Sequence, residues 1–327
     1  MSASESAAAE GEGHLPTRTG RYNGPITEAQ RWDSFRHRHD DIFICTPPKC
    51  GTTWTQTIIA MLVFGRSDID VEPATISPWL DANFTPMAAI NAMLEAQQHR
   101  RFIKTHTSLD GIPFFPECTY LCVYRDPRDT YFSMVSHLKN MNAEWVKSAI
   151  PADVHAGFRE WAQAPFIDGL AQQRSLANVA QHFRSFWRYR DLPNLHFFHY
   201  ADLSRDIVGS IMDIAAAIGV RVTAEEAQAM ARTASFENMK GKAQQFAPGA
   251  SRDQWKQSAA FFDSGKSGRW RNILDDADLK IYRDRVTALL PADAARWLED
   301  GNASGISMRA KARARPETRP QMAHRTE

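Results

Sequence analysis

Short apolar runs alternate with longer amphipathic runs along most of this chain. Four short runs, at residues 42–46, 102–104, 119–124 and 195–200, have the length and composition of buried strands. Apolar residues recur with helical spacing at 51–64, 127–139, 179–190, 205–218, 224–233 and 277–290. Because alternating strands and helices pair their strands in parallel, the pattern predicts an α/β fold, a parallel sheet with helices on both faces.

The flanks of the chain have a different composition. Residues 1–20 are rich in Ser, Ala, Glu and Gly, and residues 301–327 form a basic, Pro-containing tail, so both ends are predicted to be disordered. Residues 21–300 are predicted to form a single α/β domain. Within it, residues 76–88 and 141–168 have no clear periodicity and are predicted to be loops that carry apolar side chains.

Charge and cysteine content narrow the functional classes. The net charge of +1 gives no general field for nucleic acid or an anionic membrane, so we expect neither as a partner, and any anion site must be local. No apolar run is long enough to span a membrane, and no secretory signal pattern opens the chain. The four cysteines lack zinc-type spacing and are predicted to be buried thiols in a reducing, cytoplasmic environment.

The most informative segment is the turn at residues 47–54, Pro-Pro-Lys-Cys-Gly-Thr-Thr-Trp, between the first strand and the first helix. A helix N-terminus presents unpaired N–H groups and a partial positive charge, and Lys49 adds a full charge, so the turn predicts a phosphate site. It is not a Walker A loop, because Lys49 precedes Gly51. The alternative is an ordinary turn whose threonines cap the helix.

Residues Lys104 and His106 stand two apart at the end of the second strand. If the extended conformation continues, both point to the same face. A histidine there can act as general base toward a hydroxyl group, and a lysine can stabilise charge on a leaving oxygen. The alternative is a pair that faces solvent.

Two further segments carry candidate anion contacts. Arg125 ends the third strand, where its guanidinium fork could hold a phosphate, and Ser133 lies about two helical turns further on. The basic, glycine-punctuated segment 264–271 could close over an anion or could be a solvated surface loop. Since Tyr200 ends the fourth strand, the carboxyl ends of all four strands carry site candidates, and ligands of parallel sheets bind there.

Taken together, these motifs resemble the PAPS-dependent sulfotransferase family of the cytosolic type, over roughly residues 41–271. The turn with Lys49 is similar to the family's P-K-S-G-T-T-W loop, and residues 104–106 resemble its K-T-H motif. Residues 125–133 resemble the 3′-phosphate segment, 200–203 the stretch whose Tyr approaches the adenine, 235–240 the motif T-S-F-x-x-M-K, and 265–270 part of R-K-G-x-x-G-D-W-K.

The resemblance implies a P-loop NTPase-like fold and transfer of a sulfuryl group from PAPS, without a metal, to a hydroxyl group or an amine. It implies His106 as general base, with Lys49 and Lys104 as catalytic cations. The acceptor is expected to be a small lipophilic alcohol or phenol. The residues expected to bind PAPS are Lys49, Cys50, Gly51, Thr52, Thr53, Trp54, Arg125, Ser133, Tyr200, Ser235, Phe236, Gly265, Lys266, Ser267 and Gly268.

The sequence departs from the family pattern at several positions. Cys50 replaces a serine, Ala234 stands where a threonine is common, and Asp263-Ser264 stands where Arg-Lys usually precedes the glycine. Arg269 replaces the Asp before the tryptophan, and the family's dimer segment is not recognisable, which leaves the oligomeric state open. Two alternatives therefore remain: a P-loop nucleotide kinase, and a catalytically idle nucleotide-binding member of the same fold.

Overall fold

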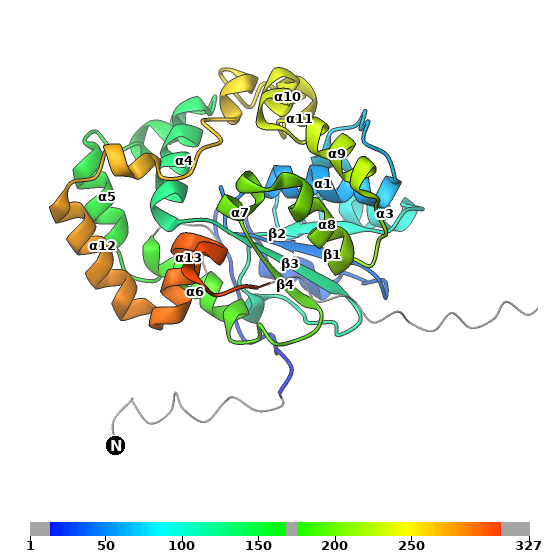
Figure 1. Cartoon of the computed structure of the whole chain (residues 1–327), viewed down its shortest axis with the longest axis horizontal. Helices are drawn as coiled ribbons and strands as arrows, with labels where there is room; N and C mark the ends of the chain where they lie inside the picture. The colour runs from blue at the N-terminus through cyan, green and yellow to red at the C-terminus, as the bar shows by residue number, and fades with distance from the viewer. Residues whose placement is uncertain (1–13, 168–174, 309–327) are drawn as a thin grey trace, which may run out of the picture.

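A computed structural model of the chain describes residues 14–167 and 175–308. A central parallel sheet is surrounded by helices, as Figure 1 shows. Its strands are β1 (Ile42–Cys45), β2 (Phe102–Thr105), β3 (Thr119–Tyr124) and β4 (Leu195–His199), in the order β2-β1-β3-β4. The register aligns Ile42 with both Phe102 and Thr119. All four strands run in the same direction, so their carboxyl ends lie along one edge.

Alternating residues of the strands contribute to two separate hydrophobic cores, because every side chain of a doubly covered sheet is buried. Ile42 and Ile44 pack into a core with residues of α1, α8 and α9. Phe43 and Cys45 pack on the opposite face, into a larger core that includes Phe183 of α6, together with residues of α12 and α13. Both faces are therefore covered, and the predicted α/β fold class is confirmed.

Thirteen α-helices occur in the described part of the chain. They are α1 (Thr52–Phe64), α2 (Pro73–Ile76), α3 (Met87–Ala96), α4 (Pro127–Asn140), α5 (Val154–Gln163), α6 (Leu176–Trp187), α7 (Tyr200–Arg205), α8 (Ile207–Ala217), α9 (Ala224–Thr233), α10 (Phe236–Gly241), α11 (Ala243–Phe246), α12 (Asp276–Leu289) and α13 (Ala292–Asp300). None of these helices has the length and apolar character that crossing a membrane requires.

The structure corrects the sequence prediction in several places. Residues 141–168 were predicted to be a loop but contain α5, and α2, α3, α10, α11 and α13 had no predicted counterpart. The fourth strand ends at His199, whose side chain accepts a hydrogen bond from the N–H of Ala201 and so caps α7. Tyr200 consequently opens a helix.

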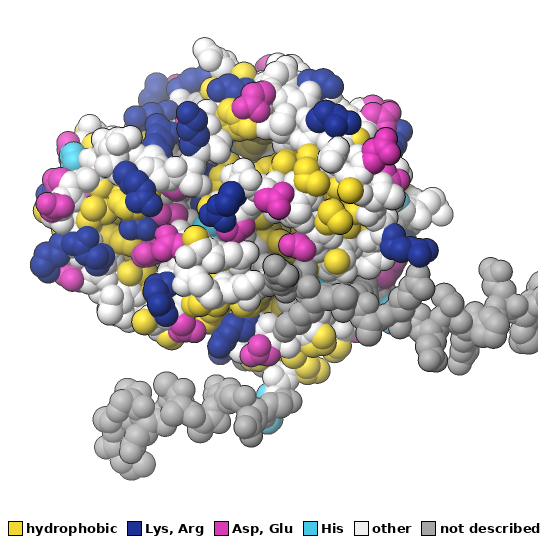
Figure 2. All heavy atoms as spheres, in the orientation of Figure 1, with side chains coloured by type: hydrophobic (Ala, Val, Ile, Leu, Met, Phe, Trp, Pro, Cys, Tyr) yellow, Lys and Arg dark blue, Asp and Glu magenta, His cyan; other side chains and the backbone are white. Residues whose placement is uncertain are grey.

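The chain ends are described only in part. Residues 1–13 and 309–327 lie outside the described residues, including most of the segments predicted to be disordered. Arg18 donates to the carbonyl of Gly111 and pairs with Asp33, and Thr19 and Gly20 donate backbone hydrogen bonds to the carbonyl of Asp110, so this segment already contacts the domain. On the face shown in Figure 2, basic and acidic side chains are interspersed, as the small net charge leads one to expect.

Candidate active site

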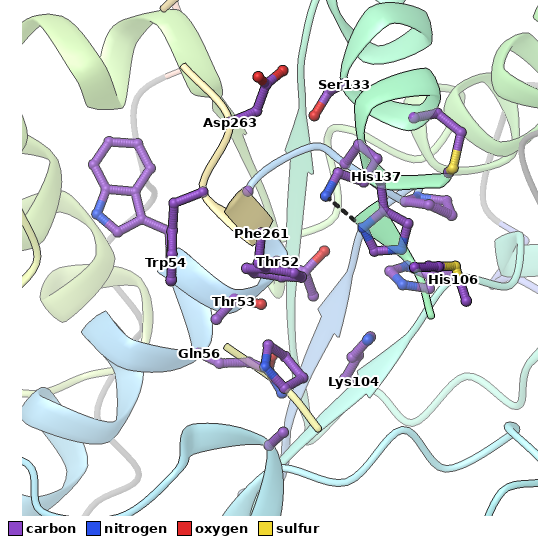
Figure 3. Close-up of a pocket in the computed structure, with 18 of the residues that line it drawn as sticks. Thr52, Thr53, Trp54, Gln56, Lys104, His106, Ser133, His137, Phe261 and Asp263 are labelled. Carbon is purple, nitrogen blue, oxygen red and sulfur yellow. Dashed lines mark hydrogen bonds between the residues drawn. The ribbon is translucent and has the colours of Figure 1, made fainter. Parts of the chain in front are cut away.

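A cavity of about 1490 Å³ opens at the carboxyl ends of the strands. Its walls come from the β1–α1 turn, the end of β2, the start and last turns of α4, and the segment from α9 to residue 269. Figure 3 shows side chains from these separate elements pointing into the common space. The predicted convergence of the strand ends on one site is therefore present.

The turn between β1 and α1 bends through two residues with positive φ. Lys49 has φ 69° and Gly51 has φ 94°, a conformation that is costly for residues other than glycine. A Cβ on residue 51 would also approach Cδ2 of Tyr200 to 3.0 Å. No side chain caps α1, which contradicts the alternative of a threonine-capped turn and leaves the first N–H groups for a ligand.

Two lysines in the cavity have lowered pKa values. Burial is the main reason that the pKa of Lys49 falls to about 8, with Arg125 and Lys104 contributing like-charge repulsion. Burial also lowers the pKa of Lys104 to about 8, and its ammonium lies 4.3 Å from the ring centre of Trp79. Both groups are cationic near neutral pH and lack a close carboxylate partner among the described residues, as expected of groups that receive an anion.

His106 is oriented by the end of β1. Its Nδ1 donates a hydrogen bond to the backbone carbonyl of Thr46 at 2.5 Å, so the neutral ring leaves Nε2 without a proton. Burial, with help from Lys104, lowers the pKa of His106 well below its usual value. Thr46 also links its hydroxyl to that of Thr52 at 2.6 Å. The histidine and the phosphate turn are thus held by the same residue.

Arg125 has an unused donor in the cavity wall. Its Nη2 donates to the carbonyl of Lys266 at 2.9 Å and its guanidinium lies 4.3 Å from the ring centre of Tyr200. Its Nε is buried and has no hydrogen-bond partner among the described residues. A buried unpaired donor on a cation is costly unless a ligand satisfies it, which indicates an anion site. Ser133 lines the same cavity.

An aromatic wall lies beside this anion site. The indole N–H of Trp54 donates to the carbonyl of Ala234 at 2.8 Å, and the Trp54 and Tyr200 rings meet edge to face at 5.4 Å. Ser235 caps α10, and Phe236 presses on Gly265, where a Cβ would come within 2.5 Å of the ring. These contacts fix the Trp54 and Tyr200 rings in an apolar wall against which a base could pack.

The glycine-punctuated segment is tied to α4. The carboxylate of Asp129 accepts the backbone N–H groups of Gly268 at 2.7 Å and of Arg269 at 3.0 Å. Arg269 forms an ion pair with Asp263, so the two departures from the family pattern neutralise each other. In Figure 3 the Asp263 carboxylate lies near Ser133.

Comparisons with known proteins agree with this geometry. A model of the sulfotransferase domain matches residues 39–291. The chain belongs to the sulfotransferase domain family. A glycolipid sulfotransferase of Mycobacterium bovis (strain BCG / Pasteur 1173P2) is 34% identical over 86% of this chain and 94% of that protein. An amine sulfotransferase of Oryctolagus cuniculus is 27% identical over 64% of this chain and 66% of that protein.

The fold is shared as well. A mouse sulfotransferase solved in complex with PAP superposes with a TM-score of 0.64, at 24% identity, over 83% of this chain and 92% of that one. The family resemblance expected from the sequence is confirmed: the protein is a sulfotransferase, an enzyme of sulfuryl transfer. Membership of the sulfotransferase family argues against both alternatives, the nucleotide kinase and the catalytically idle nucleotide-binding protein.

Most of the predicted site residues of this sulfotransferase line the cavity. They are Lys49, Gly51, Thr52, Thr53, Trp54, Lys104, His106, Arg125, Ser133, Tyr200, Ser235, Phe236 and Gly265. Four others do not line it. Cys50 is buried behind the turn, where burial raises its thiol pKa to about 12. Lys266 and Ser267 are exposed, and Gly268 hydrogen-bonds Asp129. Their roles toward PAPS stay predictions.

Sequence reasoning missed two polar residues near the reacting centre. Asp81 is buried and accepts hydrogen bonds from the hydroxyl groups of Thr105 and Thr107, and its charge raises the pKa of Lys104 against the effect of burial. His137 lies on the cavity wall, four residues after Ser133 on α4. That spacing places the two on one helix face and was the available signal for His137.

Proposed function

We propose that this sulfotransferase moves the sulfuryl group of PAPS to a hydroxyl group, or to an amine, of a lipophilic acceptor, with His106 as general base. The observation that carries the proposal is the hydrogen bond from His106 Nδ1 to Thr46. It fixes the ring with a free Nε2 at the end of β2, next to Lys104 and the phosphate turn.

The residues of the cavity fit PAPS as co-substrate. When bound, PAPS supplies the sulfuryl group and a phosphate that leaves. The uncapped N-terminus of α1 and Lys49 would hold the 5′-phosphosulfate side. The unpaired Nε of Arg125 and the Ser133 hydroxyl would hold the 3′-phosphate, and the Trp54 and Tyr200 rings would hold the adenine.

His106 would take the proton of the acceptor. Nε2 is the only ring nitrogen left to do so, since Nδ1 already donates to Thr46. The lowered pKa keeps the ring neutral at physiological pH, so the base form is always available. The acceptor oxygen would then need to lie within about 3 Å of Nε2 and opposite the leaving phosphate oxygen.

Lys49 and Lys104 would stabilise charge on the leaving oxygen. Two cations and a helix N-terminus provide fixed positive charge in a partly enclosed cavity, where such interactions are stronger than in water. A metal ion is not required by this scheme, and we propose transfer without one. Treatment with a chelator should leave the rate unchanged.

The acceptor side of the cavity is predominantly apolar. Its lining includes Trp79, Phe84, Met93, Tyr131, Met134, Leu138, Trp161, Trp255, Phe261 and Phe262. Such a wall suits a lipophilic group of considerable size. An alcohol or phenol with an apolar body fits this wall. The lipid portion of a glycolipid fits it as well, and the mycobacterial relative is named as a glycolipid sulfotransferase.

Sulfuryl transfer from radiolabelled PAPS tests the proposal. Four acceptors, a lipophilic phenol, a long-chain alcohol, a glycolipid and a primary amine, are compared for the wild type, His106→Ala and the control His39→Ala, an exposed histidine that does not line the cavity. We expect His106→Ala to reduce kcat by about 10² or more, with the Kd of PAP from calorimetry changed less than about threefold.

The same experiment can refute the assignments separately. Equal losses of PAP affinity and turnover in His106→Ala would contradict the role of base. Tight Mg²⁺-dependent binding of ATP without binding of PAP would contradict the donor. Transfer to none of the four acceptors, with PAP binding intact, would contradict the lipophilic acceptor class.

A further inference from the structure

A second histidine, His137, lines the same cavity as His106. His137 belongs to the last turn of α4, and its Nδ1 lies 3.1 Å from Nζ of Lys49. The dashed line in Figure 3 marks this contact, with Lys104 and His106 on the same side of the view. The roles assigned above do not use His137, although it touches one of the proposed catalytic cations.

The contact fixes the protonation of both partners. An ammonium group can only donate, so Nδ1 of His137 must accept and the proton of the neutral ring sits on Nε2. Burial and the nearby charges of Lys49 and Lys104 lower the pKa of His137 well below its usual value, which keeps the ring neutral. His137 and His106 therefore hold opposite tautomers, and only His106 has a free Nε2.

The ammonium group of Lys49 lies between the His137 ring and the Phe261 ring, an arrangement that we call the seat. The Phe261 ring centre lies 4.7 Å from Nζ of Lys49, within the range of a cation–π contact. The His137 ring lies 4.9 Å from that of Trp255, and the Trp255 and Phe261 rings are 5.1 Å apart. Asn140 ties this segment to α4 through hydrogen bonds of 3.0 and 3.1 Å with the backbone of Gln257.

The seat counteracts burial and like-charge repulsion. Burial disfavours the ammonium form of Lys49 most, Arg125 and Lys104 act on it as like charges, and Asp263 acts in the opposite sense. Lys49 also has a left-handed backbone conformation, which fixes where its side chain starts. Without an acceptor such as Nδ1 of His137, the ammonium would move from this place or lose its proton more readily.

We propose that His137 is a positioning residue for sulfuryl transfer, which holds the ammonium group of Lys49 between its Nδ1 and the face of Phe261. The inference rests on the proposed function, since it assigns the role of His137 through Lys49. This role predicts that substitution of His137 changes kcat more than it changes the KM of the acceptor. The reason is that Lys49 acts when PAP departs through its 5′-phosphate oxygen.

A double-mutant cycle tests the coupling. His137→Phe keeps an aromatic ring against Trp255 but removes the accepting nitrogen, and His137→Asn places an amide oxygen near the position of Nδ1. We expect His137→Phe to reduce kcat tenfold or more, and His137→Asn to restore at least half of the wild-type value. In a Lys49→Met background, His137→Phe should change kcat less than twofold. Equal losses in both backgrounds would overturn the proposal.

The pH profile separates positioning from mere packing. The titratable and charged groups around Lys49 are Arg125, Lys104, Cys50, Asp263 and His137. The variants change only His137. Loss of the accepting nitrogen disfavours the ammonium form, so in His137→Phe the alkaline fall of kcat/KM for PAPS should begin at lower pH, whereas His39→Asn should match the wild type. An unshifted alkaline limb in His137→Phe would contradict the proposal.

A measurement on the wild type needs neither turnover nor a folded variant. Nitrogen NMR of ¹⁵N-histidine-labelled protein should show Nδ1 of His137 without a proton at pH 7, and Nε2 protonated. A proton on Nδ1 would overturn the inference even if sulfuryl transfer is observed. Absence of transfer with the expected tautomer would instead contradict the proposed function alone.

Discussion

Replacement of Arg125 should separate the two phosphate-bearing ends of the donor. We predict that Arg125→Ala weakens PAP far more than it weakens adenosine 5′-phosphosulfate, which has no 3′-phosphate. The reason is that Arg125 lines the cavity together with Ser133, and its buried Nε has no hydrogen-bond partner among the described residues.

The magnitude follows from the contacts that a guanidinium group can make there. Nη2 already donates one hydrogen to Lys266, so four of the five N–H groups remain, and the fork geometry can offer two of them to one phosphate. Two charge-assisted hydrogen bonds, at about 1.5 kcal/mol each, amount to about 3 kcal/mol, or roughly a 10²-fold increase in the Kd of PAP. Adenosine 5′-phosphosulfate should lose less than about threefold.

Calorimetric titration of both nucleotides into the wild type, Arg125→Ala and Arg125→Lys measures this difference. Arg125→Lys keeps the charge but not the fork, so it should fall between the other two. The control is Arg188→Ala, a residue outside the cavity, and thermal unfolding checks that each variant is folded. Equal weakening of the two nucleotides would refute the assignment of Arg125 to the 3′-phosphate.

Three further predictions concern the two cavity lysines, the glycine-punctuated segment, and a buried ion pair beside the sheet. Because Lys49 and Lys104 have pKa values lowered to about 8, kcat/KM for PAPS should fall as pH rises through 8; a flat profile to pH 9.5 would contradict this. Gly265→Ala should weaken PAP at least tenfold through the clash with Phe236, which calorimetry can measure, whereas Gly219→Ala, with similar φ but open space, should not. Arg101→Ala should cost about 3–5 kcal/mol of unfolding free energy in urea, since it strands the buried carboxylate of Asp41; a loss below 1 kcal/mol would refute that.

The parallel sheet could be predicted from sequence because its strands are short apolar runs bounded by polar turns. The carboxyl ends of these strands carry the conspicuous residues, so much of the cavity lining followed from topology alone. Among the helices that were missed, the three with nine or ten residues each have a start signal. Pro86 and Pro291 precede α3 and α13, and Asp153 caps α5. Each is short and buries only two or three apolar side chains, but α5 and α13 are the most amphipathic helices of the described chain, so their periodic signal was present in the sequence and was overlooked.

The missed part of the site depends on contacts between distant segments. His137 contacts Lys49 because the turn after β1 and the last turn of α4 meet across 88 residues of sequence. Phe261 reaches the same place only because residues 255–261 fold back on α4 through Asn140. Similarly, Arg269 pairs with Asp263, so the charges of two departures from the family pattern offset each other only in the folded chain. None of these contacts has a local periodic pattern.

The thiol behind the phosphate turn has a practical consequence. With its pKa raised to about 12, Cys50 is ionised to roughly one part in 10⁵ at pH 7, against about 3% for an ordinary thiol. Cys45, Cys118 and Cys122 are buried as well. The native protein should therefore resist alkylation and mild oxidation. A single cysteine introduced at the rim of the cavity would be the one reactive site for a fluorescent or spin label, so donor and acceptor binding could be followed without removing any native cysteine.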